Sequence, residues 1–398
     1  MCSLRSTAER TSMSTNEVEI TPVHGSTDHR FAWLIDPFAR LVGTQGGGAA
    51  IAVYQSGRLV ADLHAGDYQA DSLQLVFSVS KSITSIAAAR AHADGLLDLD
   101  RPMATYWPEL DKPSTAGVTL RMVLAHRSGL ASLAADLSFE ELLAGADDEA
   151  IGRQEPYWEP DERHGYHAFT FGTLTNGAFR RVLGVTVGDF VREWLAEPLG
   201  LDVWIGAPAA IESRVERIRY RPSLNTAARA EHVSSSGIPG SNSGRLQATF
   251  DLYNDPRLYR TCWPSTSGVA GARDLARLFA STLDAVDGVR VVDEPTRRAM
   301  VAPLSDGVDA VLGIRTAFGS GVQLPFPHFP MVSADSYGHE AAGGSAVMAS
   351  AELELAIGFT TNVFPNTMGV SPTLLALLPT VLSCARDESP RRPPRGTR

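Results

Sequence analysis

A serine and a lysine three residues apart open the most informative segment of this 398-residue chain, residues 75–102. Ser78 and Lys81 form a Ser-x-x-Lys pattern at the start of an apolar stretch. On a helix, residues i and i+3 share a face, so the Lys81 amine can reach the Ser78 hydroxyl. A serine hydroxyl is a weak nucleophile until a base takes its proton. Lysine can be that base if its pKa falls, whereas the guanidinium of arginine stays charged.

Lysine is scarce in this chain, which draws attention to its position. Lys81 and Lys112 are the two lysines among 35 basic residues. Desolvation and the positive end of the helix dipole would both lower the pKa of Lys81 in a first helical turn. The same helix N-terminus can direct backbone N–H groups at a developing oxyanion. The alternative is a chance pattern in which Lys81 is a solvated helix residue.

Elements able to position this pair are recognisable along the chain. Because strands and a helix flank a mostly helical middle, we predict one discontinuous α/β domain, whose halves share a sheet, with a helical domain inserted. The predicted boundaries are a flexible tail over 1–30, the α/β domain over 31–100 plus 251–386, the helical insert over 101–250 and a disordered tail over 387–398. The expected elements are a hairpin over 49–64, a helix over 78–94, strands over 311–318 and 345–363, and a final helix over 371–384.

Composition narrows the class of protein. A formal charge of −10 disfavours partners such as nucleic acid or an anionic membrane surface. The apolar runs are too short for a membrane span, and the polar N-terminus lacks the apolar core of a signal peptide. The three cysteines, Cys2, Cys262 and Cys384, form no disulfide or metal pattern, so we expect a cytoplasmic protein. His164 and His167 have a spacing that suits a metal, but no partner set completes it, and no metal is predicted.

Two segments resemble the serine β-lactamase and penicillin-binding-protein superfamily. FSVSKSITSIAAARAHADGLLDLDRPMATYWPEL, beginning at Phe77, is similar to its nucleophile helix, and LRMVLAHRSGL (Leu120–Leu130) is similar to the segment that follows in the class C branch. Within that branch the family VIII carboxylesterases are the nearest match, and the resemblance covers about residues 48–363. It implies an α+β fold: an antiparallel sheet flanked by helices in three α/β/α layers, with the mostly helical domain inserted.

The resemblance extends to a tryptophan, a proline and a tyrosine, here Trp158, Pro160 and Tyr166. It implies that Tyr166 relays the nucleophile's proton together with the lysine, and that Trp158 contacts substrate. The alternative is a tyrosine that merely packs. The family's Tyr-x-Asn ends here in Ala168, which removes an amide that would hold a β-lactam or a peptide and so counts against those substrates.

A third motif replaces the superfamily's Lys-Thr-Gly by His339-Glu340-Ala341. The resemblance implies that the backbone N–H groups of Ser78 and Ala342 form an oxyanion hole, and that His339 and Gly343 contact substrate. A packed, structural His339 is the alternative. Loss of the fixed lysine charge weakens capture of the carboxylate that β-lactams and cell-wall peptides carry and that simple esters lack.

These features predict a serine hydrolase that cleaves short-chain or small aryl esters through an acyl-enzyme at Ser78. The predicted partner is a small-molecule ester, with no cofactor, nucleic acid or membrane, and the oligomeric state is unknown. Alternatives are a β-lactamase or D-amino-acid peptidase, an acyltransferase to a small alcohol, and a non-catalytic binding member of the fold.

Overall fold

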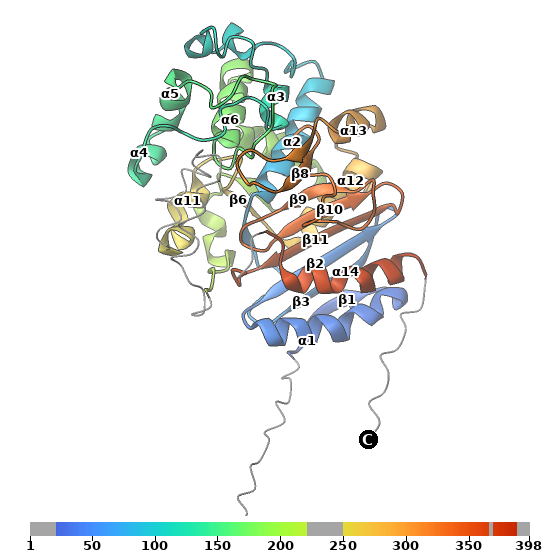
Figure 1. Ribbon diagram of the computed structural model, residues 1–398. Coiled ribbons are helices and arrows are strands. Elements are labelled where there is room, and N and C mark those ends of the chain that lie inside the picture. Colours follow the sequence, from blue (N-terminus) through green and yellow to red (C-terminus); the bar gives the residue numbers. More distant parts are fainter. Residues whose placement is uncertain (1–20, 221–249, 366–368, 388–398) are drawn as a thin grey trace, which may run out of the picture.

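An antiparallel six-stranded sheet is the largest element of the computed structural model, which describes residues 21–220, 250–365 and 369–387 (Figure 1). The strand order β1-β3-β2-β11-β10-β9 places the hairpin near the start of the chain beside strands from its end. The two ends of the chain therefore share one sheet, as predicted. The strands are β1 (Val23–Thr27), β2 (Ala49–Gln55), β3 (Arg58–Ala65), β9 (Tyr337–Glu340), β10 (Ala346–Ser350) and β11 (Leu355–Thr361).

Each face of the sheet is covered by helices. Because strand side chains alternate between faces, Ile51 and Val53 of β2 enter one core, and Ala52 and Tyr54 enter the other. The first core contains η1 (His29–Leu34), α1 (Ile35–Gln45) and α14 (Pro372–Ala385), and α12 (Ala272–Leu283) packs on the opposite face (Figure 1). The predicted three-layer arrangement is confirmed.

A smaller three-stranded sheet carries the segment that leads into the Ser-x-x-Lys helix. Its order is β4-β6-β5, formed by β4 (Gln74–Phe77), β6 (Gly268–Ala270) and β5 (Val203–Ile205), and β4 runs directly into α2 (Val79–Ala93). β5 belongs to the segment predicted as a helical insert, so that segment shares a sheet with both halves of the predicted α/β domain. The boundaries at 100 and 250 remain predictions.

The remaining described elements are mostly helices. In Figure 1 they lie above the six-stranded sheet, around α2, and to the left of the sheet, where α11 is drawn. They are η2 (Met103–Thr105), η3 (Pro108–Leu110), α3 (Leu120–Leu124), α4 (Phe139–Leu143), α5 (Ala146–Arg153), α6 (Thr170–Leu183), α7 (Val187–Val191), η4 (Arg192–Ala196), α8 (Glu197–Leu199), η5 (Ala209–Arg214), η6 (Phe250–Asn254), α11 (Pro256–Arg260), α13 (Glu294–Val301) and the hairpin of β7 (Ser305–Val308) and β8 (Arg315–Phe318).

The predicted hairpin and both predicted helices are confirmed, but two other predictions need correction. Residues 23–27, assigned to a flexible tail, form β1, which pairs with β3 although most of its side chains are exposed. Backbone hydrogen bonds hold it, and these leave no apolar pattern to read. The strand predicted over 311–318 begins only at Arg315, because the Asp309 carboxylate accepts the N–H groups of Val311 and Leu312 and turns the chain there. Residues 1–20 and 388–398 lie outside the described part.

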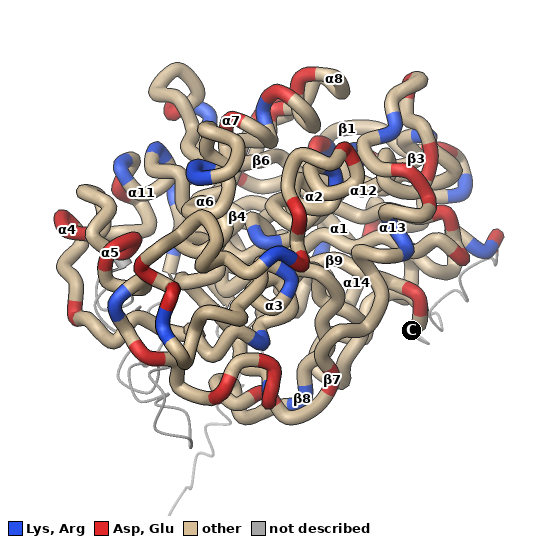
Figure 2. The backbone as a smooth tube through the Cα atoms, turned by 90° about the horizontal axis from the view of Figure 1, so that it is seen from above, with Lys and Arg blue, Asp and Glu red and all other residues tan. Residues whose placement is uncertain are grey.

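Acidic and basic residues are interspersed around the periphery rather than gathered by sign (Figure 2). Many form exposed ion pairs, such as Arg121 with Asp100 at 2.6 Å. In the part of the chain that the structure describes, no helix has the length and hydropathy needed to cross a bilayer.

Candidate active site

Ser78 lies at the junction between β4 and α2. The junction is tight, since Phe77 has φ of 46°, in the left-handed region that bulky side chains rarely adopt. Ser80 fastens it, because its Oγ donates to the Phe77 carbonyl at 2.5 Å and accepts the Gly268 N–H at 2.8 Å. Ser78 is partly exposed, whereas its neighbours are buried. The chain therefore presents one accessible hydroxyl at the start of a buried helix.

Lys81 is fully buried in the first turn of α2, and its amine contacts three oxygens. Nζ lies 3.3 Å from Ser78 Oγ, 2.8 Å from the Ala168 carbonyl oxygen and 2.9 Å from that of Ser265. Burial rules out a solvated helix residue, and desolvation lowers the pKa of Lys81 well below its ordinary value. In the neutral amine, both N–H groups can go to the carbonyls, which only accept, and the lone pair is left for the Ser78 hydroxyl.

Tyr166 completes the contacts around the serine. Its hydroxyl donates to Ser78 Oγ at 2.8 Å, and Lys81 Nζ lies 4.8 Å from the centre of its ring. Burial raises the pKa of Tyr166, and the hydrogen bond with Ser78 acts in the opposite direction. The phenol is thus protonated at neutral pH. Ser78 Oγ can accept from Tyr166 and donate to Lys81, so the three residues form one chain of proton transfers.

His339, on the edge strand β9, lies beside Tyr166 with 6.1 Å between ring centres. It is buried, and its Nδ1 is 2.6 Å from the Glu340 carbonyl oxygen. Burial lowers the pKa of His339 to about 3, so this side chain offers no positive charge to a substrate at neutral pH. Its predicted contact with substrate stays a prediction.

Glu340 has the opposite shift. Burial raises its pKa to about 7, and one carboxylate oxygen accepts the Val370 N–H at 3.0 Å. This acidic residue directly follows His339, the histidine that replaces the superfamily's lysine.

The turn after β9 carries the other predicted oxyanion residue. Ala342 is exposed, and its N–H makes no hydrogen bond within the described part of the chain. The Gly344 N–H donates to the Ala341 carbonyl at 2.8 Å and closes the turn. Gly343 is buried against Phe77, since a Cβ there would lie 2.5 Å from the phenylalanine ring, and its predicted contact with substrate stays a prediction. The contact with Phe77 brings the turn beside the residue that precedes Ser78.

Residues 38–378 match the beta-lactamase family. The chain belongs to this family. It is 30% identical over 363 residues to the esterase/beta-lactamase LipL of Mycobacterium tuberculosis (strain ATCC 25618 / H37Rv), which covers 85% of this chain and 83% of LipL.

Two solved structures in the beta-lactamase fold are also similar to the chain. A family VIII carboxylesterase matches with a TM-score of 0.82 and 23% identity, covering 91% of this chain and 100% of that one. EstA from Arthrobacter nitroguajacolicus Rue61a matches with a TM-score of 0.79 and 27% identity, covering 89% and 97%. The chain is thus a serine hydrolase of the esterase/beta-lactamase group, in agreement with the resemblance.

A buried carboxylate, that of Asp309, holds the loop around Tyr166 in this beta-lactamase family member. This loop, residues 163–169, is called the tyrosine loop below. Asp309 Oδ1 accepts the backbone N–H of Tyr166 at 3.0 Å and those of Val311 and Leu312 at 2.8 Å each. Its other oxygen accepts from Thr316 Oγ1 at 3.2 Å. Tyr166 is therefore anchored through its main chain to the β7–β8 hairpin, more than 140 residues along the chain. Sequence reasoning missed Asp309 because no motif surrounds it.

Two buried histidines, His126 and His167, make hydrogen bonds that hold the same loop. His126 Nδ1 accepts the His167 N–H at 3.0 Å, and His167 bonds the Gly165 carbonyl and Ser128 Oγ at 2.6 and 2.7 Å. Burial lowers the pKa of His167 to about 4 and that of His126 well below its ordinary value. Both are neutral structural groups. Among the described residues, no three His, Cys, Asp or Glu side chains gather as a metal-binding group.

Trp158, a predicted substrate contact, lies under the tyrosine loop. It is 5% exposed, and a Cβ on Gly165 would lie 2.7 Å from its ring. It packs with Val311 and Tyr166 in a small apolar cluster. These contacts support the loop, and a contact of Trp158 with substrate stays a prediction.

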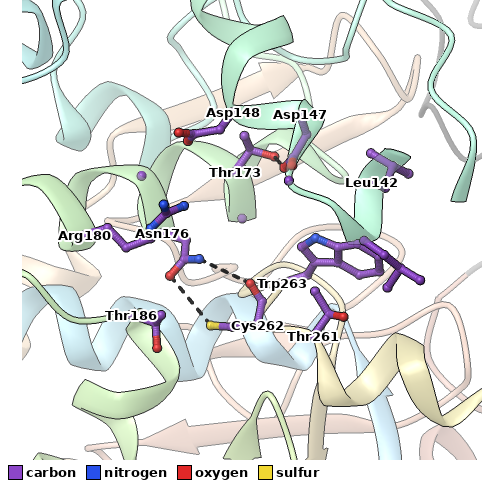
Figure 3. A pocket seen from close by; sticks show the side chains of 14 residues that line it. Leu142, Asp147, Asp148, Thr173, Asn176, Arg180, Thr186, Thr261, Cys262 and Trp263 are labelled. Atoms are coloured by element: carbon purple, nitrogen blue, oxygen red, sulfur yellow. Dashed lines mark hydrogen bonds between the residues drawn. The ribbon is translucent and has the colours of Figure 1, made fainter. Parts of the chain in front are cut away.

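A separate pocket of about 220 Å³ opens beside α6 (Figure 3). Asp147 and Thr173 meet on one side of it, joined by a hydrogen bond of 2.6 Å, and Trp263 stands on another. None of the predicted site residues lines it. One of its lining residues, Gly172, lies against Ser265, whose carbonyl accepts a hydrogen bond from Lys81: a Cβ on Gly172 would be 2.8 Å from the Ser265 nitrogen.

Proposed function

We propose that this serine hydrolase cleaves short-chain or small aryl carboxylic esters through an acyl-enzyme at Ser78. The observation that carries the proposal is the convergence of Lys81 Nζ and Tyr166 Oη on one partly exposed serine oxygen. A binding member of the fold has no need for a buried lysine of lowered pKa at this place.

The chemistry follows from the hydrogen-bond directions. Lys81 takes the Ser78 proton as Oγ attacks the ester carbonyl, and the tetrahedral oxyanion faces the N–H groups of Ser78 and Ala342. Tyr166 gives its hydroxyl proton to the departing alcohol as the carbon–oxygen bond of the ester breaks. Water then attacks the acyl-enzyme and gives one proton to the Tyr166 oxygen, Lys81 returns its proton to Ser78 Oγ, and the acid leaves.

The charges around the site favour a substrate without a carboxylate. His339 is neutral at neutral pH, and Glu340 adds negative charge as it ionises near pH 7. Ala168 lacks the side-chain amide that would hold a β-lactam or peptide, and its carbonyl is engaged by Lys81. An uncharged ester meets none of these obstacles.

β-Lactam hydrolysis is a second candidate, because the relative LipL is named for both activities. The same acyl-enzyme would serve it, but at the position of the superfamily's lysine the substrate carboxylate would meet His339, neutral at neutral pH, and the acidic Glu340. Turnover of nitrocefin at a rate similar to that of an uncharged ester would favour this candidate. Acyl transfer to an alcohol uses the same residues, and product analysis with added alcohol separates it from hydrolysis.

The decisive test is intact-protein mass after brief exposure to p-nitrophenyl butyrate and, separately, to a fluorophosphonate probe. We expect an adduct and release of p-nitrophenol in the wild type and neither in Ser78→Ala, with both proteins folded by circular dichroism. An adduct in Ser78→Ala, or none in the wild type, would overturn the proposal.

A further inference from the structure

The residue before the nucleophile has an unusual backbone conformation and an unusual neighbour. Phe77 is 4% exposed, although its φ of 46° is costly for a large side chain. Such strain persists only where surrounding contacts over-determine it, and it clusters at functional sites. The contacts that hold Phe77 in this conformation therefore point to a role for Phe77 in the function of the site.

Aromatic rings fix the Phe77 side chain. The Tyr253 ring meets it edge-on with 5.0 Å between centres, and the Phe364 ring does so at 5.9 Å. Tyr253 and Phe364 are in turn parallel to each other within 5°, 6.0 Å apart. Since T-shaped contacts are directional, the ring of Phe77 has one preferred position. The main chain at Ser78 is thus tied to a rigid cluster.

On its remaining side the Phe77 ring lies against Gly343. A Cβ at Gly343 would be 2.5 and 2.6 Å from two ring carbons, closer than non-bonded carbons approach. The backbone of Gly343 is not in the left-handed region, in contrast to Gly344 with φ of 87°. Glycine is therefore required at 343 by the ring and not by its own backbone conformation.

We propose that the contact between Phe77 and Gly343 sets the spacing of the oxyanion hole. Phe77 directly precedes Ser78, and Gly343 directly follows Ala342, so the ring fixes the separation of the two N–H donors. Phe77 and Gly343 are then positioning residues, and Gly343 acts through this spacing rather than by touching substrate. The inference rests on the proposed function and adds to it how the oxyanion donors are held.

A double-mutant cycle tests the contact. Gly343→Ala, Phe77→Ala and the double variant are compared with the wild type in kcat and KM for p-nitrophenyl butyrate, in fluorophosphonate labelling rate and in thermal unfolding. Because loss of one oxyanion donor costs about 10²–10³ in kcat, we expect Gly343→Ala to lose roughly 30-fold or more in kcat with KM nearly unchanged. In the Phe77→Ala background the same methyl meets no ring, and it should cost less than about threefold.

The outcomes separate this inference from the proposed function. Wild-type activity in folded Gly343→Ala, or an equal loss in both backgrounds, would overturn the spacing role while the acyl-enzyme stands. A loss of folding in Gly343→Ala that is restored in the double variant without restored kcat would make the contact purely structural, and that too would overturn it. A wild type that neither turns over nor labels would overturn both proposals.

Discussion

Tyr166 Oη lies 2.8 Å from Ser78 Oγ, so the serine accepts a hydrogen bond from a phenol that burial keeps protonated. The direction of this bond leaves the serine proton to the other neighbour, Lys81. It also makes Tyr166 a donor that is in place before any substrate arrives. The two roles, an amine at Lys81 that accepts a proton and a phenol at Tyr166 that donates one, can be tested by separate substitutions.

Tyr166→Phe removes the hydroxyl and leaves the packed ring. General acid–base groups contribute about 10²–10⁴-fold to rate, so we expect kcat to fall within that range with little change in thermal unfolding. Steady-state hydrolysis of p-nitrophenyl butyrate measures it, with Tyr337→Phe, at a buried tyrosine whose hydroxyl hydrogen-bonds with Thr282, as control. Wild-type kcat in Tyr166→Phe would remove the tyrosine from the proton path.

Lys81→Arg places a permanently charged guanidinium at this position and removes the base. A guanidinium cannot accept the serine proton, so we expect kcat to fall by about 10³-fold or more. The matched control is Lys112→Arg at the other lysine, which donates to the Gln154 carbonyl and lies outside the site. The rate of fluorophosphonate labelling in both variants measures the reactivity of Ser78 directly. If Lys81→Arg labelled as fast as Lys112→Arg, Lys81 would be an electrostatic support and not a base.

Asp309→Asn keeps an oxygen for the Tyr166 N–H and removes the charge. Burial is the main cause of the raised pKa of Tyr166, and the charges of Glu340 and then Asp309 add to it, so removing the Asp309 charge should move the alkaline limb of the pH–rate profile slightly to lower pH. We expect kcat to change by less than about tenfold in this variant and by more in Asp309→Ala, which also loses the anchor. Asp306→Asn, on the same hairpin but exposed, is the control. An unmoved limb in Asp309→Asn would contradict an electrostatic effect on the tyrosine.

The buried histidines make stability depend on pH. His339 and His167 have folded pKa values of about 3 and about 4, below the ordinary 6.5, so the unfolded chain binds more protons between those values. Their contribution is complete above pH 6.5 and is lost as pH falls toward the folded pKa.

We expect each of these histidines to contribute a slope of up to about 1.4 kcal/mol per pH unit in that window. Glu340 and Asp274, with raised pKa values of about 7 and about 6, act in the opposite direction over part of it. The measurement is therefore a difference: urea unfolding of wild type and His339→Gln at pH 7.5, 6.5, 5.5 and 4.5. The exposed His328→Gln should follow the wild type. Parallel curves for wild type and His339→Gln would show that His339 takes up its proton equally in the folded and unfolded chains, and would contradict a pKa lowered by burial.

Local spacing predicted much of this molecule. The Ser78–Lys81 pair follows from helical geometry, and the β2–β3 hairpin follows from alternation and a Ser-Gly turn. The features that could not be predicted depend on main-chain hydrogen bonds or on contacts between residues distant in sequence. The carbonyls around Lys81 come from Ala168 and Ser265, and a carbonyl leaves no residue-type signal. β1 was missed for the same reason.

The site residues without a motif show the same limit. Asp309 acts on Tyr166 only because the β7–β8 hairpin folds back over the tyrosine loop, and no local pattern records that. Gly343 was predicted as a site residue from the motif that contains it. Glycine is required there because a larger residue would clash with the ring of Phe77, which is far away in the sequence. Both relationships became visible only in three dimensions.

The two carbonyls that hold Lys81 have a consequence for how such an enzyme can diversify. Peptide oxygens are present whatever side chain occupies positions 168 and 265, so a substitution that leaves the local backbone in place keeps both acceptors of the amine. The side chains at these two positions can therefore change without rebuilding the catalytic base. The orientation of the catalytic amine depends, in this respect, on the path of the main chain and not on residue type.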